Sequence, residues 1–167
     1  SALVQAEKVL EKDADNLVAK KWRAVAWLGL ARNNQTPKDV EVLEELKAAF
    51  LEQQDDIGLA LALVSHIRDD LKPSNESPLA RLADGVMDSL VTANPESVNV
   101  RLLRFQYRKR NGLQDHKVDL EQAVLLDPDN PVVVREAASA ALRDAAKTLR
   151  QSDYLTARQL YKQYIQL

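Results

Sequence analysis

The stretch AVLLDPDNPVVVREAASAAL, which covers residues 123–142, decides the architecture that the sequence predicts. Its first part repeats apolar residues at helical spacing, residues 127–130 are turn and cap formers, and Pro131 begins a second helical pattern. Asp and Asn before a helix accept hydrogen bonds from its first N–H groups, and proline is favoured in the first turn. The stretch therefore predicts two helices connected by a tight four-residue turn, which we call a joint.

Similar joints recur along the chain. Residues 13–16 and 94–97 are of the same type, and a less regular version is expected near residues 54–57. Pro95 and Pro128, in successive joints, are about 33 residues apart, whereas the spacing between the earlier joints is about seven residues longer. Seven residues are close to two helical turns, so the longer helices keep their apolar faces in phase. The periodicity predicts roughly nine helices, near residues 3–12, 17–32, 36–54, 57–71, 78–93, 98–111, 117–126, 131–150 and 152–167. Expected helix starts include Thr36 with Pro37 and Asp39 for the third helix, and Ser152 with Asp153 for the last.

These repeats resemble the tetratricopeptide (TPR) family, in which a helix–turn–helix unit of about 34 residues closes with a proline. The residues that carry the resemblance are Ala123, Pro128, Asn130, Ala138, the run 153–157 and Tyr161. The first half departs from the family pattern, because its steps are long and Ala14 stands where a joint proline is usual.

The resemblance implies an all-α fold, a right-handed superhelix (α-solenoid) of about four antiparallel helix pairs. It implies a single repeat domain over residues 1–167. Because the chain starts and stops inside helical patterns, we expect it to be a fragment of a longer protein. A generic α-solenoid or helical bundle is the alternative fold.

The composition argues against several functional classes. The chain of 167 residues has 23 basic and 25 acidic residues, a net charge of -2 and no cysteine. The balanced charge argues against nucleic acid as a partner, and the lack of cysteine excludes disulfides and thiolate metal sites. No apolar run approaches the roughly 18 residues of a membrane span. Localisation stays open at this stage, with the cytoplasm favoured.

The sequence contains no pattern typical of catalysis. His66 and His116 are far apart, and no glycine-rich phosphate loop or H-E-x-x-H motif occurs. The aspartates of the joints resemble the start of a calcium loop, but the pattern fails after its third position, so helix capping is the better interpretation. We therefore expect no enzyme activity, no metal and no cofactor.

A stripe of basic residues lies on the helix expected at residues 98–111. Arg101, Arg104 and Arg108 share one side of this helix, and apolar residues flank them on both sides. One explanation is internal pairing with Asp84, Asp88, Asp119 or Glu121. The other is a site for an acidic peptide or a phosphate group, which arginine binds through two parallel hydrogen bonds.

In TPR proteins the first helix of each pair lines a concave groove, so the resemblance implies a groove here. The joint register would place the following residues toward it: Lys21, Val25, Leu28, Asn99, Leu102, Gln106, Arg110, Arg135 and Ser139, with His66 as the least certain member. This mixture of apolar, basic and amide side chains suits a peptide that carries negative charge.

The sequence therefore predicts a non-enzymatic protein–protein interaction scaffold that binds a peptide or partner protein in a concave groove. One alternative is self-association through helix faces left exposed at the ends, such as the face of Tyr161, Tyr164 and Ile165. Another is a regulatory repeat array attached to an enzyme elsewhere in a longer chain.

Overall fold

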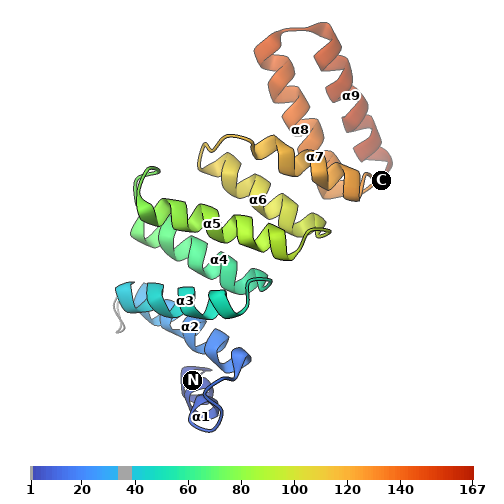
Figure 1. Cartoon of the computed structure of the whole chain (residues 1–167). Helices are drawn as coiled ribbons and strands as arrows, with labels where there is room; N and C mark the ends of the chain where they lie inside the picture. The colour runs from blue at the N-terminus through green and yellow to red at the C-terminus, as the bar shows by residue number, and fades with distance from the viewer. Residues whose placement is uncertain (1, 34–38) are drawn as a thin grey trace. The chain divides into compact units, whose positions relative to one another are not determined.

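The computed structural model describes residues 2–33 and 39–167, and these residues are helical almost throughout (Figure 1). No strand occurs in this part of the chain. The elements are α1 (Ala2–Leu10), α2 (Leu17–Arg32), α3 (Asp39–Glu52), α4 (Ile57–Ser65), a π-helix η1 (His66–Leu71), α5 (Pro78–Ala93), α6 (Val98–Arg110), α7 (His116–Leu126), α8 (Pro131–Thr148) and α9 (Gln151–Gln166). The all-α class predicted from the sequence is confirmed.

The chain divides into two compact units at the third joint. Unit 1 comprises residues 1–94 with α1 to α5, and unit 2 comprises residues 95–167 with α6 to α9. Each unit is built from consecutive helices that pack side by side with short connections (Figure 1). The expectation of a single repeat domain over residues 1–167 stays a prediction.

A capped joint precedes α2, α4, α6 and α8. In each case the side chain of the capping residue accepts a hydrogen bond from the backbone N–H three residues later, which satisfies one of the unpaired donors of the first turn. The bonds join Ala19 to Asn16, Leu59 to Asp56, Val100 to Ser97 and Val133 to Asn130, over 3.0, 2.9, 3.3 and 3.4 Å. The second joint spans residues 53–56, one residue earlier than expected, because Asp56 is the residue that caps.

The joints divide the helices into two classes. We call α2, α4, α6 and α8 the A-helices, because each follows a joint, and α1, α3, α5, α7 and α9 the B-helices. An A-helix packs against the B-helix that follows it, as α2 does with α3 and α8 with α9. This is the helix-pair repeat that the spacing of the joints predicts.

The fourth predicted helix is not a single α-helix. Its α-helical part ends at Ser65, and η1 continues it to Leu71 with wider turns, ending at Lys72 in the left-handed conformation. The Lys72 N–H donates to the carbonyl oxygen of Ile67, five residues back, at 3.1 Å. Short π-helical turns are tolerated where tertiary contacts hold them, and side chains of η1 contact other helices of unit 1.

One expected helix start differs in the structure, and another lies outside the described residues. The last helix begins at Gln151 after Arg150, so Ser152 and Asp153 lie in its first turn instead of capping it. The Asp153 carboxylate accepts hydrogen bonds from the hydroxyls of Thr148 and Ser152. Thr36 and Pro37, expected at the start of α3, lie outside the described residues.

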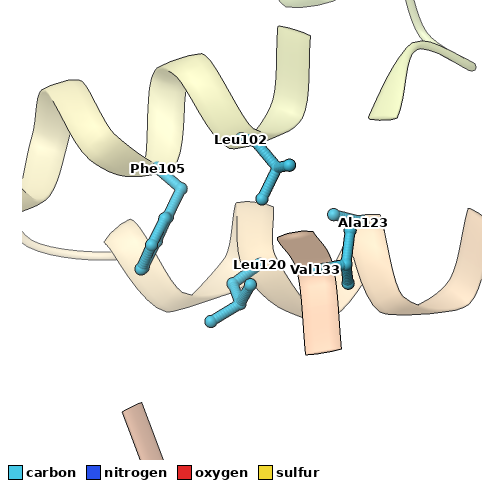
Figure 2. Packing of buried hydrophobic residues seen from close by; sticks show 5 residues of the cluster. All are labelled: Leu102, Phe105, Leu120, Ala123 and Val133. Atoms are coloured by element: carbon cyan, nitrogen blue, oxygen red, sulfur yellow. The ribbon is translucent and has the colours of Figure 1, made fainter. Parts of the chain in front are cut away.

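The core of unit 2 gathers residues from three consecutive helices. Figure 2 shows the side chains of Leu102 and Phe105 from α6, Leu120 and Ala123 from α7, and Val133 from α8. Phe105, Ala123 and Val133 are completely buried. The small side chain of Ala123 leaves room for its neighbours in this core.

Removing one cap should destabilise the fold measurably. Asn130→Ala removes the acceptor for the N–H groups of Val132 and Val133, and we expect a loss of about 1 kcal/mol in the free energy of unfolding. Asn130→Ser retains a capping oxygen and should cost less. Urea unfolding followed by circular dichroism tests both variants; equal losses would contradict the capping role.

Candidate protein-interaction surface

The exposed side of the A-helices is the surface that the sequence singles out. With the second joint placed at residues 53–56, the position five residues after each cap is occupied by Lys21, Leu61, Leu102 and Arg135. The position nine residues after each cap is occupied by Val25, Ser65, Gln106 and Ser139. Leu61 and Ser65 are therefore the residues of α4 that correspond to the predicted groove residues.

In unit 1, Lys21 and Val25 are half-buried, and Lys21 is engaged with the second joint. Its Nζ lies 2.6 Å from Oδ2 of Asp56, the cap of α4. Burial alone would raise the pKa of Asp56, but hydrogen bonds from Lys21 and from the Leu59 N–H hold it below its ordinary value. One ion pair thus connects the start of α4 to the side of α2.

Three of the predicted groove residues are buried. Leu28 and Leu102 have exposed fractions of 5% and 7%, and their side chains pack into the cores of their own units. The exposed fraction of His66 is 1%, because it begins η1 and points between helices. These three side chains are therefore not accessible to a partner on the surface of the A-helices.

His66 belongs to a polar cluster that connects η1 with α2 and α3. Its Nε2 lies 3.1 Å from the carbonyl oxygen of Asp39, and its Nδ1 lies 3.2 Å from Oδ2 of Asp70. The Nε of Arg32 donates to the same Asp70 oxygen at 2.8 Å. Burial opposes ionisation of Asp70, but the hydrogen bonds from Arg32 and His66 lower its pKa. Arg32, Asp39, His66 and Asp70 line a cavity of about 260 Å³.

In unit 2, most of the predicted residues are accessible. Asn99, Gln106 and Arg110 are exposed along one side of α6, and Arg135 is exposed on α8. Ser139 is half-buried, with its hydroxyl 3.3 Å from that of Tyr161 on α9. This side of unit 2 presents amide and guanidinium groups.

Glu136 of α8 is approached by basic groups from two A-helices. The Nζ of Lys109 lies 3.4 Å from Oε2 of Glu136, and a guanidinium nitrogen of Arg135 lies 3.8 Å from Oε1. The Lys109 ammonium also lies 5.2 Å from the centre of the Phe105 ring. α6 and α8 therefore bring their charged side chains together at the edge of this surface.

The basic stripe of α6 converges on one buried carboxylate. Asp119 of α7 has no exposed surface, and Arg104 donates to both of its oxygens, at 2.9 and 2.6 Å. Nitrogens of Arg101 and Arg108 lie 3.6 Å from the same carboxylate. Internal pairing with Asp119, one of the two explanations considered for the stripe, is thus present in the structure. The second explanation, an acidic-peptide or phosphate site, stays a hypothesis.

Sequence reasoning missed several polar contacts between helices. Arg23 of α2 donates to Glu45 of α3 at 2.5 Å, and Arg68 of η1 donates to Asp84 of α5 at 2.7 Å. Each pair joins residues on different helices of unit 1. The charges were visible in the sequence, but no local pattern says which of many acids a given arginine meets.

The described part of the chain offers no cluster of three or more His, Cys, Asp or Glu side chains that could hold a metal ion. Among the helices of the described residues, none combines the length and apolar character that crossing a membrane requires.

Asp119 should be one of the most sensitive positions of unit 2. Asp119→Ala removes the acceptor of a buried bidentate pair, and we expect a loss of about 3–5 kcal/mol in the free energy of unfolding. Glu121→Ala, at an exposed position of the same helix, should change it by less than about 0.5 kcal/mol. Urea unfolding compares the two, and similar losses would rule out a central role for Asp119.

The Asp56–Lys21 pair should make stability depend on pH. Because folding lowers the pKa of Asp56, its stabilising effect is complete above the ordinary value of about 3.9 and is lost as the pH falls through the lowered value. Asp56→Asn retains a capping oxygen but removes the charge, so it should be less stable than the parent near neutral pH and should lose this deficit in acid. Urea unfolding as a function of pH measures the difference; a deficit that does not change with pH would contradict the assignment.

The fold resembles solved structures, whereas the sequence gives no match. No family model and no curated protein matches the chain. A structure described as MamA MSR-1 C2 superposes with a TM-score of 0.57 at 19% identity, covering 96% of this chain and 85% of that one. A point mutant of MamA gives 0.56 at 18% identity, covering 95% and 85%. TTC0263, a thermophilic TPR protein of Thermus thermophilus, gives 0.53 at 18% identity, covering 99% and 89%. The chain therefore has a TPR-like fold, an all-α solenoid of helix pairs.

Proposed function

We propose that this chain is a non-enzymatic scaffold that binds a peptide or partner protein on the exposed side of its A-helices. The TPR-like fold supports a protein-interaction role in general. The observation that carries the more specific proposal is on α6. One side of this helix is buried in the core of unit 2, while Asn99, Gln106 and Arg110 stand exposed on the other.

The chemistry of the surface on unit 2 suits a segment that carries carboxylates. Side-chain amides, such as those of Asn99 and Gln106, can both donate to and accept from the backbone of an extended peptide. Arg110 and Arg135 offer planar guanidinium groups, which bind carboxylates through paired hydrogen bonds. An acidic protein segment is therefore the class of partner that we propose for unit 2.

The corresponding surface of unit 1 is less polar. Val25 is half-buried and Leu61 is exposed, while Lys21 is already paired with Asp56. An apolar side chain of a partner would bury surface against Val25 and Leu61. We therefore propose that apolar contacts contribute most to recognition on unit 1.

Charge reversal on unit 2 tests the acidic-segment proposal. The probes are two synthetic peptide libraries of equal length, one with fixed Glu positions and one with fixed Lys positions. The parent chain should bind the acidic library preferentially, and Arg110→Glu combined with Arg135→Glu should weaken this binding at least tenfold, about 1.4 kcal/mol. Fluorescence anisotropy measures the affinities.

Arg158→Glu combined with Lys162→Glu is the matched control, since both residues are exposed on the B-helix α9. This control should leave the affinity unchanged. Equal affinity of the parent for both libraries, or equal loss in both double variants, would exclude the proposed surface.

Self-association is the second candidate function. Ile165 of α9 has an exposed fraction of 80%, and Leu155 has one of 55%, so apolar surface is available at this end of unit 2. If copies associate through α9, Ile165→Lys should lower the average mass measured by light scattering at high protein concentration. A strict monomer at every concentration would exclude this function.

A further inference from the structure

An apolar groove lies between α1 and α2 in unit 1. Its cavity has a volume of about 360 Å³ and is lined by Ala2, Gln5, Ala6, Val9, Asn16, Val18, Ala19 and Trp22. Val9, Val18 and Trp22 have exposed fractions of 41%, 63% and 51%, although all three are large apolar side chains. Ala6 and Ala19 are buried at its floor.

The same arrangement of helices occurs a second time in unit 1, and there the groove is filled. The caps Asn16 and Asp56 are 40 residues apart, and a shift of 40 residues aligns the sequence of α1 and α2 with that of α3 and α4. The residues that correspond to Ala2, Ala6, Val9 and Ala19 are Val42, Leu46, Ala49 and Leu59, all of them buried. There α2 packs against both α3 and α4.

Polar contacts at the rim fix α2 on α3 and α4. Arg23 meets Glu45 at 2.5 Å, Lys21 meets Asp56 at 2.6 Å and Lys20 meets Glu52 at 2.9 Å, so three basic residues face three acids. The positions that correspond to these acids beside the empty groove are Gln5, Asn16 and Lys12. The groove between α1 and α2 therefore has two neutral amides and one basic residue at the positions where the filled groove has three acids.

From this internal comparison we infer that the groove between α1 and α2 binds an amphipathic helix of a partner protein, placed as α2 is placed on α3 and α4. The partner carries an acidic side chain opposite Lys12, where α2 carries Lys20. It also carries a large apolar side chain at the centre of its contact face, because Ala6 and Ala19 replace Leu46 and Leu59 and leave the floor hollow.

The charge at the rim argues against a second copy of this chain as the occupant. A copy of α2 would bring Lys20 close to Lys12 and Arg23 close to the uncharged Gln5. Its central residue on that face is Ala24, which is completely buried in its own unit and too small to fill the hollow floor. The groove thus differs from its filled counterpart in both charge and shape.

The experiment uses a lactam-bridged helical peptide with the 16-residue sequence of α2, changed by Lys20→Glu, Arg23→Gln and Ala24→Leu. A second peptide retains Lys20 and is otherwise identical. Both peptides also carry Phe in place of Trp22 and Trp27, so all tryptophan fluorescence comes from the chain. Trp22 of the chain lines the groove, so its fluorescence reports binding, and titration calorimetry gives the affinities. The Glu peptide should bind about fivefold more tightly than the Lys peptide.

Variants of the chain then test the site itself. Val9→Glu, at an exposed position of the groove, should weaken binding at least tenfold, and Lys12→Glu should reverse the preference toward the Lys peptide. Arg110→Glu with Arg135→Glu should have no effect, which separates this site from the surface proposed on unit 2. Absence of binding by both peptides, or binding that Val9→Glu leaves unchanged, would overturn the inference. So would a dimer that Val9→Glu dissociates, since that result would make a second copy the occupant.

Discussion

The rest of the structure depends on one local interaction, the hydrogen bond from a backbone N–H to the side chain of the capping residue three positions earlier. It occurs at Asn16, Asp56, Ser97 and Asn130, and each time it begins an A-helix. Four backbone donors at a helix start have no partner within the helix, so a cap at a fixed position defines where the helix begins. The caps are 40, 41 and 33 residues apart, and they divide unequal stretches of sequence into equivalent helix pairs.

Side-chain amides donate to backbone carbonyl oxygens at or beside the joints within each unit. In unit 1, Gln53 at the second joint donates to the carbonyl oxygen of Leu17, and Asn94 at the third joint donates to that of Asp55. In unit 2, Gln163 of α9 donates to the carbonyl oxygen of Pro128. A joint leaves backbone carbonyls without helical partners, so an amide from the following repeat can satisfy them. These bonds keep repeats of different length in register.

Ion pairs between helices help to hold each unit together. Asp119 and Asp70 each accept hydrogen bonds from a basic side chain on another helix, and in both cases an arginine supplies the donor. Asp119 is buried, and a buried carboxylate is costly unless it is paired, so the positions of its partners become fixed. Ion pairs between helices also line the rim of the filled groove on α3 and α4. The groove between α1 and α2 lacks the corresponding acids, so the helix that we propose for it carries a different pattern of charge.

The interactions that span only a few residues were predictable from the sequence. The joints at residues 13–16, 94–97 and 127–130 were recognisable as turn and cap formers, and Pro131 marked a helix start. The second joint lies one residue earlier than predicted, and this changes which residues of α4 face the surface, because a shift of one residue rotates a helix face by about 100°. As a result, His66 was assigned to the groove surface in place of Leu61 and Ser65.

The sequence by itself determined the helical class, the repeat and most of the caps, because these follow from side chains acting on their own backbone neighbourhood. The tertiary structure alone decided the burial of Leu28, Leu102 and Asp119, the π-helix at His66 and the choice of Asp119 as the partner of the basic stripe. A helical pattern shows which residues share a face, but only the neighbouring helix decides whether that face is covered and by which charge.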